Sequence, residues 1–520
     1  MLGLAASTRF DTRGVRGQLF ATHDVPRSRA HAHTRTRAHA LHYIDLHMRR
    51  PLLALPALAL CSAASLAAQA PAALTPHQQL AHDVYKQLVE INTADSVGSV
   101  TRAAEAMAAR FRAAGFPDSD VVLIGPPGKP TKENLVVRYH ARANATRKPL
   151  LLLAHLDVVA ARRSEWPRDP FTLNEENGYF LGRGTSDDKA MAAIFVANLL
   201  DYKKEGFRPD RDIILALTAD EESGDANGAQ WLTQTHKPLI DAAYALNEGG
   251  GGVLDGNRPV LQTIQAAEKV SVHFTLTTTN RGGHSSVPRA DNAIYELASA
   301  LLRVAAYHFP VALNDVTRSY FERTAAVSAP EMASAMRAIV ANPADTVAAA
   351  TLSRNPAYAS MLRTTCVATR LSGGHAYNAL PQTATANVNC RIVPTSTDTA
   401  VMATLARVIA DTGVKITYTL MPDAKFGVVP TPVAPELLAA TTALTKQMWG
   451  DIPVIPTMST GATDGRFLRS VGIPTYGVSG LFSAPGETNA HGRDEKLRVK
   501  SFYDGLAFLD QLVRRLASSR

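Results

Sequence analysis

Acidic and imidazole side chains follow apolar runs at five places along the chain. They are His155 with Asp157 in LLLAHLD, Asp187 in GRGTSDDK, Glu221 with Glu222 in ALTADEESG, Glu248 in ALNEGG, and His491 in NAHGRDE. Buried strands that deliver His, Asp and Glu to one rim of a sheet build a metal site from nitrogen and oxygen ligands. The series therefore predicts a hydrolytic site for a divalent metal such as zinc.

Each motif taken alone also has a structural interpretation. The alternation of a strand places His155 and Asp157 on one face, where the carboxylate could hold the second ring nitrogen of a ligating imidazole. A buried, hydrogen-bonded histidine is the alternative. Asp187 could bridge two metals from the start of a helix, or either Asp187 or Asp188 could merely cap that helix.

The DEESG motif places three adjacent acids after a strand. Like charges this close raise each other's pKa unless a cation is present. A metal resolves the conflict if Glu222 ligates it and Glu221 acts as general base. A solvated acidic turn is the alternative for an isolated motif of this kind.

The surrounding elements are typical of an α/β sandwich. Helical periodicity covers residues 76–95 and 99–115, and KPLLLLAHLDVV is the near-continuous apolar run of a strand buried on both faces. A helix follows Asp187, and RDIILALTA returns to strand. Alternating strands and helices of this kind predict an α/β sandwich.

A second domain is predicted inside the first. Residues 267–421 have the order βαββαβ, with a mostly helical insertion near 314–360, which suits a small ferredoxin-like domain. We expect it to separate two parts of the catalytic domain, residues 71–266 and 422–520.

The motifs HLD, GRGTSDDK, DEES, NEGG and NAHGRDE resemble, in order and spacing, those of the co-catalytic zinc exopeptidase family. That family includes aminoacylase, acetylornithine deacetylase, succinyl-diaminopimelate desuccinylase, carboxypeptidase S and bacterial glutamate carboxypeptidase. The resemblance covers roughly residues 76–515. The helical insertion together with SGGHAYNALPQTATANVNCRIVP looks most like the carboxypeptidase S and secreted N-fatty-acyl amino acid hydrolase branch. It implies a zinc-exopeptidase α/β/α sandwich with an inserted lid or dimerisation domain.

The resemblance also implies a role for each motif residue. His155 and Glu248 would bind one zinc, Glu222 and His491 the other, and Asp187 would bridge them. Asp157 would orient His155, and Glu221 would be the base. The peptide bond between Asp187 and Asp188 resembles the family's cis bond. Two zinc ions are the expected cofactors, although these ligands would also admit Mn or Co.

Four further residues match the family's substrate contacts. His284 in RGGHSS would stabilise the oxyanion. Asn378 and Arg391 would bind the substrate carboxylate, and Gly461 would contact the substrate through its backbone. We expect a metallohydrolase that cleaves the amide next to a free α-carboxylate, as a carboxypeptidase or an N-acyl-amino-acid hydrolase. A dipeptidase or aminopeptidase on the same site, and a non-catalytic peptide-binding homologue, are the alternatives.

The first seventy residues have a different character. Residues 1–47 are low-complexity sequence, expected to be disordered or to precede a true start at Met48, and residues 48–70 have the order of a signal peptide. We expect a periplasmic or secreted protein with no stable membrane span after cleavage. Residues 1–50 hold nine Arg and three Asp, so most of the net charge of +8 lies there, and nucleic-acid binding is not indicated.

Cysteines and assembly leave two questions open. Cys366 and Cys390 lie in strand-like segments that could pair as a disulfide or remain two buried thiols. The expected partner is a peptide or N-acyl amino acid substrate. Both a monomer and a homodimer remain possible, because the insertion could alter the surface through which compact bacterial members pair.

Overall fold

A ten-stranded mixed sheet forms the centre of the larger domain. The computed structural model describes residues 73–419, 430 and 432–518; residues 1–72, with the predicted extension and signal peptide, lie outside this range. The strands run in the order β1-β2-β6-β3-β7-β17-β9-β8-β18, and β16 pairs with β9. Their bounds are β1 (Val121–Ile124), β2 (Asn134–Tyr139), β3 (Leu150–His155), β6 (Ile213–Thr218), β7 (Tyr244–Asn247), β8 (Gly252–Asp255), β9 (Arg258–Glu268), β16 (Val454–Ser459), β17 (Thr475–Gly477) and β18 (Phe482–Ser483).

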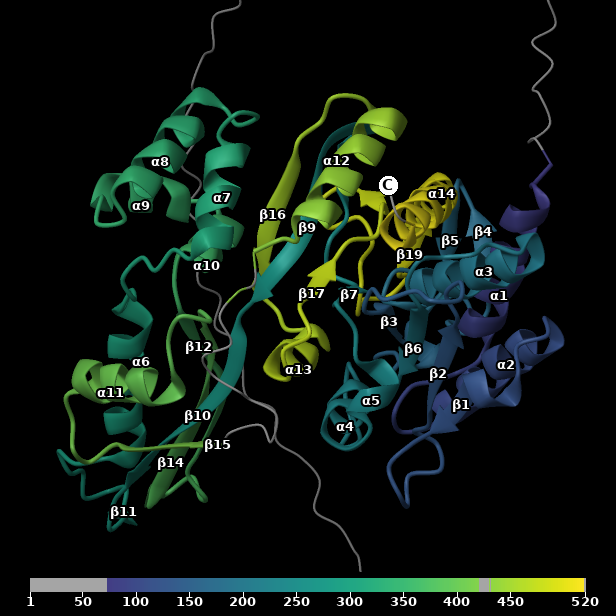
Figure 1. Ribbon diagram of the computed structural model, residues 1–520. Coiled ribbons are helices and arrows are strands. Elements are labelled where there is room, and N and C mark those ends of the chain that lie inside the picture. The colour runs from purple at the N-terminus through teal and green to yellow at the C-terminus, as the bar shows by residue number, and fades with distance from the viewer. Residues whose placement is uncertain (1–72, 420–429, 431, 519–520) are drawn as a thin grey trace, which may run out of the picture. The chain divides into compact units, whose positions relative to one another are not determined.

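Alternating side chains of the central strands enter two different cores. In β3, Leu150 and Leu152 join the core under one layer of helices, whereas Leu151 and Leu153 join the core under the other. The first layer contains α1 (Pro76–Glu90), α2 (Val100–Ala113), α3 (Lys189–Glu205), α12 (Pro435–Trp449) and α14 (Val499–Ala517). The second contains α4 (Gly228–Thr235), α5 (Lys237–Ile240) and α13 (Gly465–Ser470). Helices α1, α3 and α14 lie side by side in Figure 1. The predicted α/β/α sandwich is confirmed.

Short elements complete this domain. A three-stranded sheet pairs β4 (Asn174–Glu176), β5 (Tyr179–Leu181) and β19 (Lys496–Arg498), and two 3-10 turns cover Asp118–Asp120 and Arg163–Glu165. Strands β5 and β19 therefore join the segment before α3 to the segment before α14. None of the described helices is both long and apolar enough to cross a bilayer.

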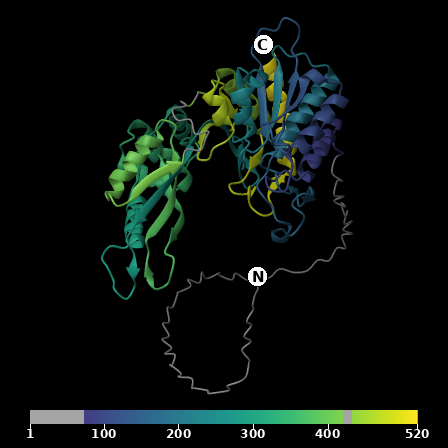
Figure 2. The same ribbon diagram turned by 90° about the horizontal axis from the view of Figure 1, so that it is seen from below.

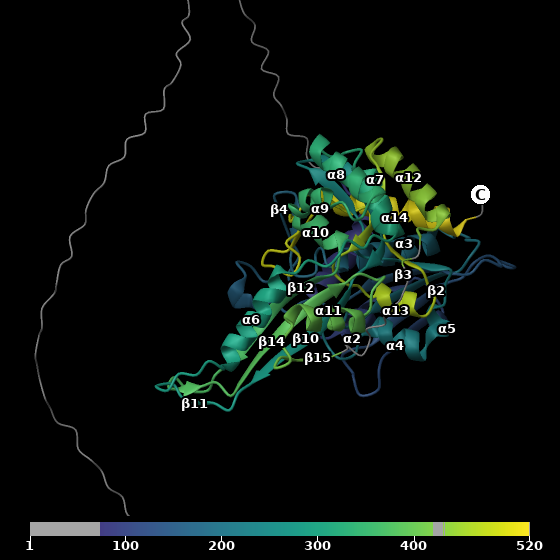
Figure 3. The same cartoon turned by 90° about the vertical axis from the view of Figure 1, so that its left-hand side faces the viewer.

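The inserted domain has a four-stranded antiparallel sheet in the order β12-β14-β10-β15. Along the chain its elements are β10 (Val270–Thr279), α6 (Ala293–Ala306), β12 (Thr365–Gly373), β14 (Thr383–Ile392), α11 (Asp398–Ile409) and β15 (Lys415–Thr419). This is the predicted βαββαβ order with the strand arrangement of a ferredoxin-like sheet. Figure 2 shows the green helices of this domain along one face of its sheet. A two-stranded ribbon, β11 (Gly283–His284) with β13 (Ala379–Leu380), lies beyond the end of β10 in Figure 3.

Four helices lie between α6 and β12. They are α7 (Asp315–Thr324), α8 (Pro330–Ala341), α9 (Thr346–Ser353) and α10 (Pro356–Leu362). They share a small core around Phe321, Met336 and Leu352. Helix α7 also contacts β16 of the larger sheet, where Arg323 donates to the carbonyl oxygen of Val454 at 3.3 Å.

A disulfide joins Cys366 to Cys390. The two residues are direct partners in the register of β12 and β14. The disulfide is therefore a cross-strand link within the inserted sheet, and the question that the sequence leaves open is answered in favour of pairing.

Candidate metal centre

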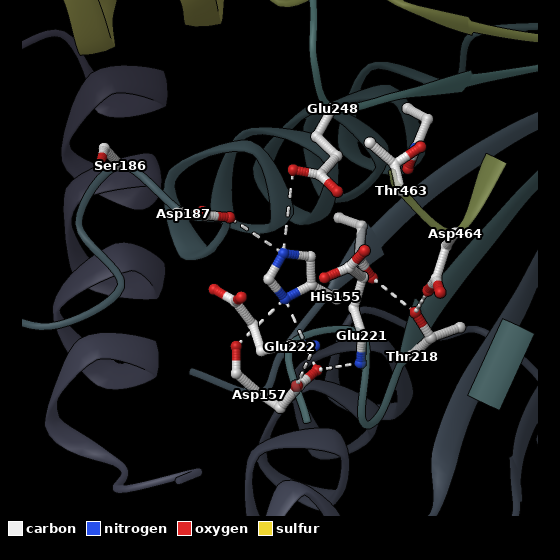
Figure 4. A network of polar contacts seen from close by, with 12 residues as sticks. His155, Asp157, Ser186, Asp187, Thr218, Glu221, Glu222, Glu248, Thr463 and Asp464 are labelled. Carbon is white, nitrogen blue, oxygen red and sulfur yellow. Dashed lines mark hydrogen bonds and ion pairs between the residues drawn. The ribbon is translucent and has the colours of Figure 1, made fainter. Parts of the chain in front are cut away.

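Three adjacent parallel strands end next to one another at the centre of the large sheet. Strand β3 lies between β6 and β7 and is parallel to both. His155 ends β3, the acidic segment 220–222 follows β6, and Glu248 follows β7. Because the carboxyl ends of parallel strands share one edge of a sheet, these side chains meet there. Figure 4 shows Glu221, Glu222 and Glu248 around the His155 ring.

Asp187 reaches the same place from the loop before α3. Its Oδ1 lies 3.1 Å from Nε2 of His155. The peptide bond between Asp187 and Asp188 is cis, as the family resemblance implies. Gly184 allows this loop to pass tightly, because it has a φ of +82° and a Cβ there would lie 2.7 Å from a methyl group of Val158.

His491 comes from the loop between β18 and β19. Its Nε2 lies 2.9 Å from Glu222 Oε1 and 3.2 Å from Asp187 Oδ2. The backbone of His491 is left-handed, with a φ of 63°. Arg183 holds this backbone by donating to the carbonyl oxygens of His491 and Gly492, at 3.2 and 3.0 Å.

These side chains form two groups that could each hold a metal ion. One contains His155, Asp187 and Glu248, and the other contains Asp187, Glu222 and His491. Within each group the candidate ligand atoms lie within 4.8 Å of one another. The two groups coincide with the two ligand sets that the resemblance implies, and Asp187 offers one oxygen to each. The ligand roles themselves stay predictions.

The charges of the cluster favour the binding of cations. Burial, followed by neighbouring charges, raises the pKa of Glu222 to about 7, and burial also raises the pKa values of Glu221 and Glu248 well above their ordinary range. Asp187 is different, because hydrogen bonds from His155 and His491 outweigh burial and lower its pKa. Several buried carboxylates therefore share only two imidazoles, and this excess of negative charge is typical of a site for divalent cations.

The donor set fits zinc, manganese or cobalt. Each group offers one imidazole nitrogen and two carboxylates, and no cysteine of the described residues takes part. When bound, two such cations supply Lewis acidity toward an amide carbonyl and lower the pKa of a water molecule.

Asp157 connects the predicted base to the predicted ligands. Its carboxylate accepts the backbone N–H of Glu221 at 3.0 Å and that of Glu222 at 2.9 Å. Nδ1 of His155 lies 3.1 Å from the backbone carbonyl oxygen of Asp157 and 3.5 Å from its carboxylate. The nearer orienting atom for His155 is thus the carbonyl oxygen of Asp157, and the carboxylate mainly fixes the backbone that carries Glu221.

Sequence reasoning missed a buried ion pair that joins two of the motifs. Glu495, only 1% exposed, accepts hydrogen bonds from the backbone N–H groups of Ser186 and Asp187 at 2.8 and 3.0 Å. Its other oxygen lies 2.7 Å from Arg183. The pair therefore fixes the Asp187 loop and the His491 loop together. The signal was present in the sequence, because Glu495 belongs to NAHGRDE and Arg183 to GRGTSDDK.

A second group of supporting residues surrounds the end of β6. Asp464, 2% exposed, accepts from Thr218 Oγ1 at 3.0 Å and from Asn227 Nδ2 at 2.7 Å. On the other side, Lys132 pairs with the buried Asp220, which precedes the base in the chain. Figure 4 shows Asp464 and Thr218 beside Glu221. No spacing in the sequence connects these segments.

The residues predicted to contact the substrate lie outside the carboxylate cluster. His284 is exposed in β11, and the carbonyl oxygen of Asn378 accepts the N–H of the next residue, Ser285, at 2.9 Å, so the segments carrying His284 and Asn378 are neighbours. Arg391 is half-buried in β14, and the N–H of Gly461 donates to Ser459 Oγ at 3.1 Å. No hydrogen bond or ion pair among the described residues joins these four predicted contacts to the carboxylate cluster.

Comparison with known proteins agrees with this geometry. A model of peptidase family M20/M25/M40 matches residues 151–515. The chain is 28% identical over 385 residues to the N-fatty-acyl-amino acid synthase/hydrolase PM20D1 of Homo sapiens, which covers 71% of this chain and 74% of that protein. It is 27% identical over 403 residues to the probable carboxypeptidase S-like 2 of Dictyostelium discoideum, with 74% and 75% covered.

A solved structure shares the fold. The M20 family metallo-carboxypeptidase Sso-CP2 from Sulfolobus solfataricus superposes with a TM-score of 0.63 and 19% sequence identity, over 84% of this chain and 98% of that chain. The resemblance and the fold class inferred from the sequence motifs are confirmed by these matches.

Proposed function

The chain belongs to peptidase family M20/M25/M40, whose members hydrolyse peptide and amide bonds with metal ions, and from this premise we propose its substrate class. The enzyme cleaves the amide bond next to a free α-carboxylate, as a carboxypeptidase or an N-acyl-amino-acid hydrolase. The observation that carries this proposal is Arg391, a half-buried cation that no carboxylate of the described residues neutralises.

The position of Arg391 in the sheet supports this role. On β14 the even-numbered residues from Ala384 to Ile392 are buried, and several pack against α6 and α11, whereas Arg391 projects from the opposite face. Burial, followed by the charge of Arg466, lowers the pKa of Arg391. A guanidinium in this environment gains most from a planar carboxylate that it can grip with two hydrogen bonds. Asn378 and Gly461 are the other proposed polar contacts to the substrate.

Glu221 is the proposed proton-transfer residue. A buried carboxylate whose pKa is raised exchanges protons efficiently near neutral pH. Glu221 accepts a proton from the water that attacks the amide carbon, and then donates it to the nitrogen as the C–N bond breaks. His284 donates a hydrogen bond to the carbonyl oxygen as negative charge develops there. The products are a carboxylic acid and an amine.

The proposal is tested with matched substrate pairs. N-acetyl and N-palmitoyl derivatives of leucine and phenylalanine are assayed beside their C-terminal carboxamides and beside dipeptides, with and without chelator. We expect turnover of the free acids, little turnover of the carboxamides, and loss of activity with chelator. Arg391→Ala should raise KM for the free acids by about tenfold or more, whereas Arg370→Ala, on the exposed strand β12, should not. An aminopeptidase would instead require a free amine and tolerate Arg391→Ala.

We propose zinc as the metal in both groups, with manganese or cobalt as the alternatives that the ligands allow. Elemental analysis of the purified protein should give about two metal ions per chain, one for each group. The oligomeric state, monomer or homodimer, is measured on the same sample by light scattering.

We also propose that residues 48–70 direct export to the periplasm or the exterior. The Cys366–Cys390 disulfide supports this proposal, because structural disulfides persist in oxidising compartments. N-terminal sequencing of the mature protein tests it. A mature chain that still begins at Met1 or Met48 would contradict export by cleavage.

A further inference from the structure

Lys269 is a fully buried amine at the junction of the two sheets. It is the single residue between β9 and β10, and its side chain is 0% exposed. Its Nζ donates to Ser360 Oγ at 3.1 Å and to Thr365 Oγ1 at 3.3 Å. No carboxylate of the described residues pairs with this Nζ. Burial of an ammonium group without a counter-ion is unfavourable in free energy.

The neighbouring acid is already engaged. Glu268 accepts two hydrogen bonds from Thr463, at 2.8 and 2.9 Å, and forms an ion pair with Arg469. Its charge is therefore shared with another buried cation. Hydroxyl groups are the only hydrogen-bond acceptors recorded for Lys269 Nζ among the described residues, and they solvate an ammonium without neutralising it.

The charge that acts on Lys269 is also positive. Thr365, which accepts from Lys269, is the direct register partner of Arg391 across β12 and β14. Burial, followed by the charge of Arg391, lowers the pKa of Lys269 to about 7. Arg391 is affected in turn by Arg466 of α13. Three cations from three separate segments of the chain thus interact around Arg391.

We infer that Lys269 is a positioning residue that makes the Arg391 site select a carboxylate over a neutral group. This inference rests on the proposed function, in which Arg391 binds the substrate carboxylate. Because Lys269 is inaccessible, it acts through Arg391 and does not touch the substrate. An anion bound to Arg391 relieves the repulsion between the two cations, and a neutral carboxamide does not. Relief of this repulsion therefore favours binding of the carboxylate over binding of the carboxamide.

The test compares charge with hydrogen bonding at one position. Lys269→Met removes the charge and keeps the length of the stem, whereas Lys269→Gln also keeps a donor for Ser360 and Thr365. For the N-acetyl amino acid that the wild type cleaves fastest, we expect both variants to raise KM by about tenfold with kcat within about threefold. Competitive inhibition by the corresponding carboxamide should be unchanged. Lys446→Met, on the exposed surface of α12, is the matched control.

Other results would contradict either the role of Lys269 or the proposed function. Equal losses for acid and carboxamide, or an unchanged KM for the acid, would overturn the role of Lys269. If both Lys269 variants lose their circular dichroism spectrum while Ser360→Ala keeps it, the amine serves the fold and the inference is likewise overturned. Failure of the proposed function is visible in the wild type alone, as turnover that is indifferent to the carboxylate.

Discussion

The carboxylate of Asp157 accepts the backbone N–H of Glu221 at 3.0 Å. Asp157 also stands two residues beyond His155 and contacts its ring through a carbonyl oxygen. The segment that carries the proposed base is therefore attached to the strand end that carries a proposed ligand. Asp157 therefore positions the proposed base and a proposed metal ligand relative to each other.

Replacing the base should separate chemistry from metal binding. Glu221→Gln keeps the size of the side chain and leaves its backbone N–H bonded to Asp157, but the amide cannot accept a proton. We expect kcat to fall by roughly 10²–10⁴-fold, the usual contribution of a general base. Metal content, measured by elemental analysis, should stay at the wild-type value. A variant with full activity would exclude Glu221 as the base.

Removing ligands should change the metal content in a graded way. His491→Ala affects only the group that contains Glu222, so we expect loss of about one metal per chain. Asp187→Ala affects both groups and should weaken both sites. Titration of the metal-free protein with zinc, measured by calorimetry, distinguishes the two variants. Identical titration curves would contradict the bridging role of Asp187.

The Arg183–Glu495 pair should matter for stability as well as for the site. Glu495→Gln leaves a buried guanidinium without its counter-ion, and breaking such a pair costs about 3–5 kcal/mol of unfolding free energy. Arg183→Met combined with Glu495→Gln should recover part of that loss, because neither charge is then stranded. Urea unfolding of the chelated proteins provides the measurement. Additive losses in the double variant would show that the two residues act independently.

The metal-free protein, prepared with a chelator, should lose stability as the pH rises from about 6.5 to 9. The hydrogen bond with Asp187, the largest cause, raises the pKa of His491 to about 9, above its ordinary 6.5. Its contribution is therefore fully present below pH 6.5 and is lost as the pH rises through 9. Burial raises the pKa of Glu222 to about 7, above its ordinary 4.5, so its ionisation destabilises the metal-free fold between about pH 4.5 and 7, mostly below this range.

Zinc should reverse this trend, because metal binding requires deprotonated ligands. We expect the difference in Tm between zinc-loaded and chelated protein to grow across this pH range. Differential scanning calorimetry at several pH values measures it. A difference that stays constant with pH would argue against these two groups as ligands, and the double variant with His491→Gln and Glu222→Gln should show a flatter profile.

The sequence predicted the parts of the site that strands deliver directly. LLLAHLD, DEES and NEGG each follow a strand, and the parallel pairing of β6, β3 and β7 is enough to bring His155, Glu222 and Glu248 together. The βαββαβ order of the inserted domain was likewise readable from periodicity. Both depend on local patterns that a single chain displays.

The supporting residues depend on contacts between distant segments. Arg183 and Glu495 are 312 positions apart, and Thr218 and Asp464 are 246 apart. Lys269 looks like an ordinary charged residue in AAEKVSV until the fold buries it completely. The second function of Asp157 was also hidden, because hydrogen bonds to backbone N–H groups leave no trace in residue spacing.

The shared position of Asp187 has a thermodynamic consequence. One carboxylate contributes an oxygen to each group, so a cation in the first group changes the charge and the orientation that the second cation meets. By linkage, the factor by which the first ion alters the affinity for the second equals the factor in the opposite direction. If both groups bind a cation as proposed, the two sites have no independent dissociation constants. Their occupancy at a given metal concentration is a property of the pair.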